Sequence, residues 1–229
     1  MKTIFILGGY GYTGKFLAKH LLAHTDANII IAGRNLSKAQ TIVKELNNPR
    51  VSARQADATD RNRLTDVLQG VTLCLVAAPT THHAENVIRA CIDARVDYLD
   101  VQFAAQKLKV LYAAQDEIQK ANLCFITEAG YHPGLLAVLI RFAATKLDTL
   151  TSAVTAGYLN MKDIPYSEAV DELMEGFLDI KLKSTKTVHG PNHLPGICVI
   201  LILAATLENE PVIPCSLKSC APSLKFSRP

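Results

Sequence analysis

One stretch near the start of the chain, an apolar strand that runs directly into closely spaced glycines, constrains the fold most strongly. Residues 3–7 are apolar or β-branched, and an amphipathic helical pattern follows the glycines. The spacing Gly9-x-Gly11-x-x-Gly14 matches the fingerprint of dinucleotide-binding folds. In that fingerprint Gly9 permits the turn, Gly11 lets the backbone approach a pyrophosphate, and Gly14 lets the helix pack on the strand. Because the first N–H groups of such a helix have no intrahelical partner, the stretch predicts a diphosphate site.

The end of the next expected strand favours NADP over NAD as the cofactor. The apolar residues 28–32 lead into Arg34 and Asn35. NAD-binding proteins place an Asp or Glu near this position to bond the ribose 2′-hydroxyl, whereas an Arg accommodates the 2′-phosphate of NADP. A guanidinium group binds such a phosphate with two parallel hydrogen bonds, and Lys38, one helical turn further on, adds a second positive charge.

The charge and cysteine content exclude several classes of protein. A net charge of +3, with no run of Lys or Arg, gives no electrostatic basis for binding nucleic acid or a membrane surface. The longest apolar run, residues 197–207, is much shorter than the ~20 residues that span a bilayer. The 6 cysteines form no C-x-x-C pair and are expected to be reduced. An expected strand begins only two residues from the N-terminus and leaves no room for a signal peptide, so these features predict a cytoplasmic protein.

Apolar strands alternate with amphipathic helices over the first half of the chain. This alternation predicts an α/β fold with a doubly wound parallel sheet of the Rossmann type over residues 1–130. Asp60 is expected to cap the helix that begins at Arg61. We expect strands over residues 3–7, 28–32, 51–56, 71–77, 98–101 and 123–127, and helices over residues 36–46, 61–68, 82–94 and 107–121.

The pattern changes after residue 130. Residues 131–190 are expected to form an incomplete α+β second domain, with a role in substrate binding or dimerisation. It is expected to contain a helix over residues 135–144 that is buried on most sides and strands over residues 151–158 and 180–188. Prolines interrupt residues 191–229, which are expected to be irregular or disordered.

Several short motifs occur together in this chain. They are Gly8–Gly14, Ala32–Asn35, Asp57–Ala58, Ala77–Pro79, Cys91–Asp100 and Glu128–Leu135. As a set they resemble the saccharopine dehydrogenase-like family of NADP-binding oxidoreductases, over roughly residues 1–190. Members of that family are typically longer, with a full second domain that closes over the substrate, so the resemblance describes a C-terminally shortened member.

The resemblance implies which residues contact the cofactor and which reaction follows. The activity it implies is hydride transfer between the nicotinamide and a C–N bond of an amino-acid-like substrate. It places Asp57 and Ala58 beside the adenine, and residues 77–79 near the nicotinamide ribose. The expected cofactor-binding residues are therefore Gly9, Tyr10, Gly11, Tyr12, Thr13, Gly14, Arg34, Asn35, Lys38, Asp57, Ala58, Ala77, Ala78 and Pro79.

Such a reaction needs a group that manages one proton, with a pKa near the working pH. His132 is the first candidate and Glu128 the second, because both follow the sixth expected strand. His132 also precedes a helix that starts with a proline, and a cap or a packed side chain is the alternative role. The adjacent pair His82 and His83 lacks the spacing of metal ligands, so no metal site is expected.

Two other functions fit parts of the sequence. One is a non-catalytic NADP-binding protein, either a redox sensor or the remnant of an enzyme. The other is a short-chain dehydrogenase, because Tyr158-x-x-x-Lys162 has the spacing of that family's catalytic pair; β-forming residues before Tyr158 and Pro165 after it argue against the necessary helix. An incomplete second domain leaves apolar surface, for which a homodimer is one possible cover.

Overall fold

The computed structural model describes all residues except 103–104, 132–133, 149–151, 161–169, 172–197 and 207–229. The described residues divide into two compact units. Residues 1–135 and 170–171 belong to the first unit, and residues 136–148, 152–160 and 198–206 belong to the second.

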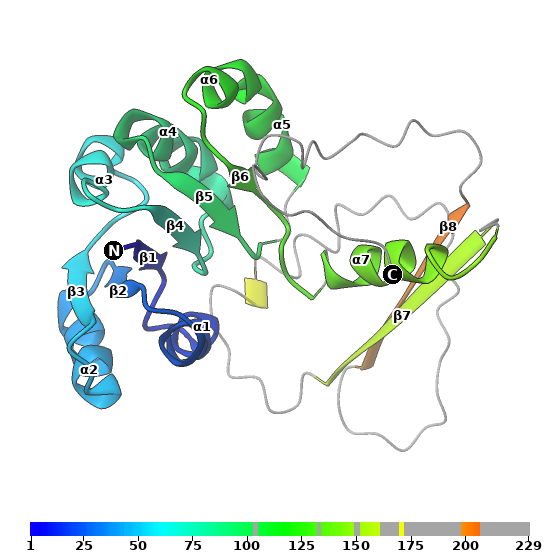
Figure 1. Cartoon of the computed structure of the whole chain (residues 1–229), viewed down its shortest axis with the longest axis horizontal. Coiled ribbons are helices and arrows are strands. Elements are labelled where there is room, and N and C mark those ends of the chain that lie inside the picture. The colour runs from blue at the N-terminus through cyan, green and yellow to red at the C-terminus, as the bar shows by residue number, and fades with distance from the viewer. Residues whose placement is uncertain (103–104, 132–133, 149–151, 161–169, 172–197, 207–229) are drawn as a thin grey trace. The chain divides into compact units, whose positions relative to one another are not determined.

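The first unit contains a parallel sheet in the order β3-β2-β1-β4-β5-β6 (Figure 1). All five neighbouring pairs are parallel, and the strand order reverses between β1 and β4. Ligands of such sheets bind at this reversal, outside the carboxyl ends of the strands. The strands are β1 (Thr3–Leu7), β2 (Asn28–Gly33), β3 (Val51–Gln55), β4 (Leu73–Val76), β5 (Asp97–Asp100) and β6 (Phe125–Ile126). The predicted doubly wound sheet is therefore confirmed.

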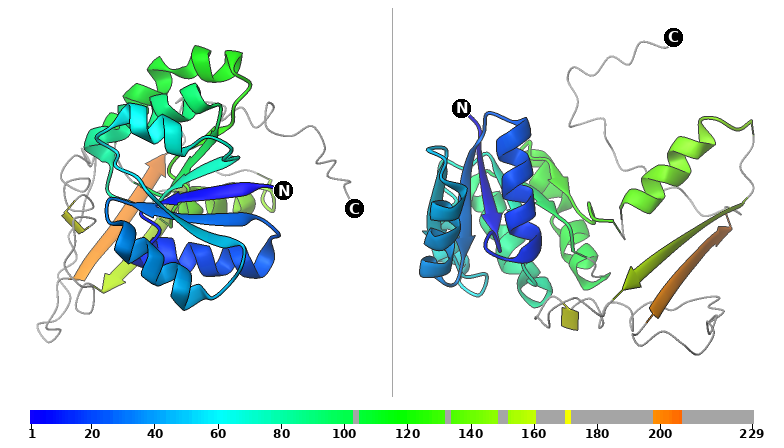
Figure 2. Two further views of the ribbon diagram at one scale, coloured as in Figure 1. Left: turned by 90° about the vertical axis from the view of Figure 1, so that its left-hand side faces the viewer. Right: turned by 90° about the horizontal axis from the view of Figure 1, so that it is seen from below.

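Helices cover both faces of this sheet. Helices α1 and α2 lie on one face, and α3 to α6 lie on the other (Figure 1, Figure 2). The helices are α1 (Tyr12–His24), α2 (Leu36–Leu46), α3 (Arg61–Val67), α4 (Ala84–Ala94), α5 (Ala105–Ala113) and α6 (Gln115–Lys120), and the 3₁₀ turn η1 (Thr81–His83) precedes α4. Asp60 caps α3 as predicted, because its side chain accepts a hydrogen bond from the Arg63 N–H.

Each central strand contributes apolar side chains to a separate core on each face. In β1, Phe5 faces the core under α3 and α4, whereas Ile6 faces the core under α1 and α2. In β2, Ile30 and Ile31 divide in the same way. Side chains alternate along a strand, so a strand that is apolar at every position is suited only to the middle of a sheet covered on both faces.

Most strands and helices end within two residues of the expected positions, but three elements differ in a more visible way. The helix expected over residues 107–121 is divided at Ala114, whose backbone (ψ 0°) ends α5 and begins α6. Residues 81–83 form a 3₁₀ turn and not the first turn of α4. Strand β6 is only two residues long. Helix ends are set by local hydrogen bonds that periodicity does not resolve, and these shifts leave the topology unchanged.

The described part of the second unit consists of helix α7 (Leu135–Ala144) and an antiparallel pair, β7 (Ser152–Asn160) and β8 (Cys198–Thr206). Strand β8 lies within the region expected to be irregular, because the apolar run around Ile200 pairs along the whole of β7. The expected strand over residues 180–188 lies outside the described residues. Helix α7 forms as predicted, but Val138 and Phe142 remain 59% and 62% exposed, so the expected burial is not found.

In the part of the chain that the structure describes, no helix has both the length and the apolar character needed to cross a membrane. Cys74 and Cys91 are free and buried in the first unit. A hydrogen bond with Cys74, together with burial, raises the pKa of the Cys91 thiol well above its usual value. Cys124 is disulfide-bonded, which differs from the expectation that every cysteine is reduced.

Candidate cofactor site

The glycine turn leaves the carboxyl end of β1 and opens helix α1 toward the edge of the sheet where the strand order reverses. Gly11 is the N-cap of α1, and its position carries no side chain that caps the helix. The first N–H groups of α1 therefore have no intrahelical acceptor and no capping side chain, and a ligand phosphate can accept from them. A Cβ atom at Gly14 would overlap the carbonyl oxygen of Gly8, which explains why this position must be glycine.

The β1 turn and the loop after β4 touch at Gly8. This residue has φ +85°, and a Cβ atom added to it would lie 2.7 Å from the Cβ of Ala78. The Ala77 N–H also donates to the Leu7 carbonyl at 2.8 Å. The structure thus brings together the glycine turn and residues 77–79, both of which the sequence predicts to contact the cofactor. Gly8 itself was not among the predicted residues, although it is the one with the left-handed backbone.

The end of β2 carries the predicted NADP-selecting residues on an open rim. Arg34, Asn35 and Lys38 are all exposed. Tyr10 connects this rim to the glycine turn, because its hydroxyl accepts a hydrogen bond from the Asn35 N–H at 3.2 Å and its ring lies against Gly33. The Asn35 side chain caps α2 by accepting from the Lys38 N–H at 3.0 Å. The rim thus carries two exposed cations, Arg34 directly after β2 and Lys38 in the first turn of α2.

Asp57 follows the end of β3 by two residues, and its charge interacts with that of Arg34. Its carboxylate accepts from the Thr59 N–H at 3.0 Å and from the Thr59 hydroxyl at 2.9 Å. The hydrogen bond from the Thr59 backbone is the main reason why the pKa of Asp57 is lowered, and the charges of Arg34 and His83 add to the effect. Ala58 is buried, 8% exposed, and its carbonyl accepts a hydrogen bond from the Asn86 side chain at 3.1 Å.

A buried ion pair lies at the carboxyl end of β5. Asp100 and Lys107 are both 0% exposed, and the Lys107 Nζ lies 2.6 Å from the Asp100 Oδ1. The Tyr98 and Thr127 hydroxyls donate to Asp100 Oδ2 at 2.7 and 2.8 Å. The N–H groups of Gln102 and Glu128 donate to Oδ1 at 3.1 and 3.2 Å. Asp100 therefore accepts hydrogen bonds from β5, from α5 and from the segment after β6.

Of the two candidate proton-transfer residues, the structure describes Glu128, and His132 lies outside the described residues. Glu128 has φ +59°, which is uncommon for a residue with a side chain. Burial raises the pKa of its carboxyl group, the Lys107 charge opposes this, and the Asp100 charge adds to it. Glu128 is therefore a half-buried carboxyl group, with a raised pKa, that follows the last strand of the sheet.

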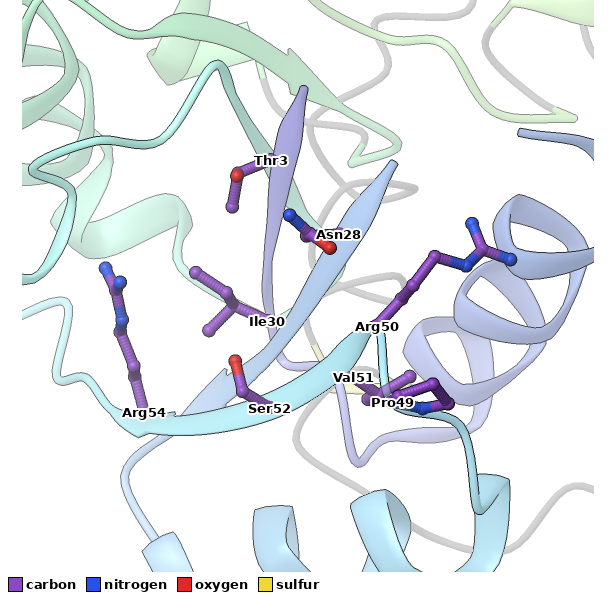
Figure 3. A pocket seen from close by; sticks show the side chains of 8 residues that line it. All are labelled: Thr3, Asn28, Ile30, Pro49, Arg50, Val51, Ser52 and Arg54. Atoms are coloured by element: carbon purple, nitrogen blue, oxygen red, sulfur yellow. The ribbon is translucent and has the colours of Figure 1, made fainter. Parts of the chain in front are cut away.

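A separate hollow of about 230 Å³ lies at the amino ends of β1, β2 and β3 (Figure 3). It contains two arginines, but both guanidinium groups donate to backbone carbonyls. Arg50 donates to the carbonyls of Leu22, Thr25 and Ala27, and Arg54 to that of Val67. These bonds fasten the ends of α1 and α3, and the hollow is at the opposite end of the strands from the glycine turn. It is therefore not the cofactor site.

Comparison with protein families agrees with this geometry. Residues 4–123 match the saccharopine dehydrogenase NADP-binding domain. The chain belongs to this family. The resemblance drawn from the sequence motifs is thus confirmed, and the cofactor of the domain is NADP, as expected from Arg34.

Several known proteins are similar to this chain. The saccharopine dehydrogenase [NADP(+), L-glutamate-forming] of Saccharomyces cerevisiae is 28% identical over 58% of this chain and 28% of its own length. The carboxynorspermidine synthase of Vibrio cholerae is 27% identical over 61% of this chain and 39% of its own length. The solved apo structure of the yeast enzyme aligns with a TM-score of 0.61 at 23% identity, over 71% of this chain and 36% of that chain. The chain thus spans well under half of the length of these relatives.

Two other predictions from the sequence concern a catalytic Tyr–Lys pair and a metal site. Tyr158 lies in strand β7, whereas the short-chain dehydrogenase mechanism needs it on a helix, and Lys162 lies outside the described residues. That alternative is therefore wrong. Among the described residues, no group of three or more His, Cys, Asp or Glu side chains is placed to hold a metal ion.

Sequence reasoning missed Lys107 and Gln102, which organise the carboxyl ends of β4, β5 and β6. A lysine near the start of an expected helix is usually exposed, and nothing local marks it as buried. The only available signal was Asp100, a carboxylate at the carboxyl end of a buried strand, which requires a partner when it is buried.

Proposed function

We propose that the first unit binds NADP across the reversal point of the sheet, and that the protein is an oxidoreductase that transfers hydride at a C–N bond of an amino-acid-like substrate. The observation that carries the proposal is the uncapped N-terminus of α1, which follows a glycine turn that lies against Ala78 at Gly8, with the exposed Arg34 at the tip of the neighbouring strand. The pyrophosphate accepts from the first N–H groups of α1. The Arg34 guanidinium binds the 2′-phosphate.

The named relatives support the reaction class. They include a glutamate-forming saccharopine dehydrogenase, a carboxynorspermidine synthase and a carboxyaminopropylagmatine dehydrogenase of Synechocystis. When bound, the nicotinamide supplies the hydride chemistry, and the protein must orient the substrate and move one proton. Glu128 is the described residue suited to that proton, because its carboxyl pKa is raised toward the working range and it follows the sheet edge next to Asp100.

Cofactor selectivity tests the binding part of this proposal. Purified protein is titrated with NADPH and with NADH by calorimetry or by the fluorescence of the bound nicotinamide. Arg34→Asp should weaken NADPH binding by about 10–100-fold, because it removes charge-assisted hydrogen bonds of about 1.5–3 kcal/mol and adds a repelling charge. NADH binding should change little.

Two variants control this titration. Lys44→Asp makes the same charge change on the exposed end of α2 and should leave both affinities within about twofold, because salt screens a charge at this distance. Arg34→Lys keeps the charge but loses the planar fork, so it should fall between wild type and Arg34→Asp. Equal affinities of the wild type for NADPH and NADH would refute the role of Arg34.

The catalytic part is tested by NADPH oxidation in the presence of a keto acid and an amine. An enzyme should consume NADPH only when both are present, because the imine forms from the pair. Tight NADPH binding without turnover for any pair would instead support the non-catalytic alternative, a redox sensor or an enzyme remnant.

A further inference from the structure

The side chain of Gln102, which follows β5, makes hydrogen bonds to the loop after β4. The Gln102 Nε2 donates to the Ala78 carbonyl, and its Oε1 accepts from the Thr80 hydroxyl at 3.3 Å. Thr80 and Gln102 are 6% and 8% exposed. The partners also fix the orientation of the amide, because a carbonyl oxygen only accepts hydrogen bonds.

The backbone of Gln102 is fixed in turn by the buried ion pair. Its N–H donates to Asp100 Oδ1 at 3.1 Å, and its carbonyl accepts from Lys107 Nζ at 3.0 Å. Both partners are fully buried, so water cannot replace them, and breaking either bond would leave a buried charged group with fewer partners. The backbone of Gln102, from which its side chain extends, is therefore fixed relative to β5 and α5.

The loop that Gln102 holds is the one that touches the glycine turn. Ala78 lies against Gly8, closely enough that a Cβ atom at Gly8 would overlap it. A dinucleotide at the reversal point of the sheet extends from the turn after β1 across the loop after β4. The adenine end contacts the tip of β2 instead, on the other side of β1. Movement of the Ala78 loop would thus disturb the nicotinamide half of the cofactor and spare the adenine half.

We propose that Gln102 is a positioning residue for the nicotinamide half of NADP. Its backbone is fixed by the Asp100–Lys107 pair, and its side chain in turn fixes the loop at Ala78 and Thr80. This rests on the proposed cofactor site. It goes beyond that site because neither Gln102 nor the ion pair is part of the glycine turn or of the NADP-selecting rim.

The test compares two ligands that differ only in the half of the cofactor they contain. NADPH spans both halves, whereas adenosine 2′,5′-bisphosphate contains only the adenine, its ribose, the 2′-phosphate and the 5′-phosphate. Gln102→Met keeps the length of the side chain and removes both hydrogen bonds. It should raise the Kd for NADPH about tenfold, the equivalent of one or two hydrogen bonds, and leave the Kd for adenosine 2′,5′-bisphosphate within about twofold.

Two matched glutamine variants make the readout specific. Gln55 braces the adenine side, since its Nε2 donates to the Arg34 carbonyl at 3.0 Å, and Gln55→Met should weaken both ligands to a similar extent. Gln69 donates to Thr65 within an exposed helix end, and Gln69→Met should change neither Kd. Thr80→Val removes only the hydroxyl bond and should give a smaller, two- to fivefold loss that is again confined to NADPH, which provides a second variant if Gln102→Met folds poorly.

The two Kd values of each variant decide whether Gln102 has this positioning role. A selective loss of NADPH affinity in Gln102→Met or Thr80→Val supports the positioning role. Equal loss of both ligands, or unchanged NADPH affinity in a folded variant, overturns it while the proposed NADP site stands. Failure of the wild type to bind either ligand overturns the proposed site and the inference with it.

Discussion

Replacing Lys107 with methionine should destabilise the first unit far more than breaking an ion pair of similar geometry on the surface. The Lys107 ammonium lies 2.6 Å from Asp100, both side chains are fully buried, and the same ammonium donates to the Gln102 carbonyl. Its removal leaves a buried carboxylate without a counter-charge, which typically costs about 3–5 kcal/mol. Four neutral donors still face Asp100, so we expect about 3 kcal/mol, toward the lower end.

The control is Arg61→Met. Arg61 donates to Asp93 at 2.7 Å, almost the same distance, but the two side chains are 46% and 39% exposed. Exposed pairs contribute about 0–1 kcal/mol, and this variant should lose no more than that.

The assay is urea unfolding of the wild type, Lys107→Met, Asp100→Asn and the double variant, followed by circular dichroism. Since each charged group stabilises the other, the free energy of unfolding of the double variant should fall by less than the sum of the two single decreases, with a coupling energy of about 1–3 kcal/mol. If Lys107→Met lowered the free energy of unfolding no more than Arg61→Met does, the argument that burial makes this ion pair important for stability would be refuted.

Three further changes test separate parts of the structure. Gly14→Ala should abolish NADPH binding and cost about 1–3 kcal/mol of stability, because its Cβ would overlap the Gly8 carbonyl; unchanged calorimetric binding would contradict this. Arg95→Gly should raise the urea midpoint by an amount equivalent to about 0.5–1 kcal/mol, because Arg95 (φ +56°) ends α4 in the left-handed conformation and glycine adopts it without a steric cost; a lower midpoint would count against the reading. Glu128→Gln should be more stable than wild type at neutral pH. The folded-state pKa of Glu128 is raised, so the wild type has its full stability below the unfolded pKa and loses some as the pH rises through the folded pKa; the difference should vanish below about pH 4, and a difference that grew there would have the wrong sign.

The parts of the fold that depend on neighbouring residues could be predicted from the sequence. Strands that are apolar at every position, such as residues 28–32, are suited only to a sheet covered on both faces, and the two cores confirm this. Asp60 was predicted as a cap because an N-cap interaction joins residues three apart in the chain.

The parts that depend on distant residues could not be predicted. The hydrogen-bond donors to Asp100 come from three different parts of the chain between residues 98 and 128. Because the Asp100 carboxylate is fully hydrogen-bonded, it can serve as the buried partner that Lys107 needs. No local pattern distinguishes this lysine from an exposed one. The contact between Gly8 and Ala78 is of the same kind, since it depends on the register of β1 against β4.

The two halves of the proposed cofactor site differ in how firmly their residues are held. At the adenine rim, Gln55 and Tyr10 make hydrogen bonds at exposed positions, where water competes and each bond contributes about 1 kcal/mol. At the nicotinamide side, Gln102 and Asp100 are buried, and a broken bond there leaves an unsatisfied group in a medium of low dielectric constant. A hydride must pass over a short and well-oriented distance, whereas selection of a 2′-phosphate needs only a positive charge within reach. In the proposed function, the buried hydrogen bonds therefore lie on the side of the site where geometry decides hydride transfer, and the exposed ones lie on the side where charge selects the cofactor.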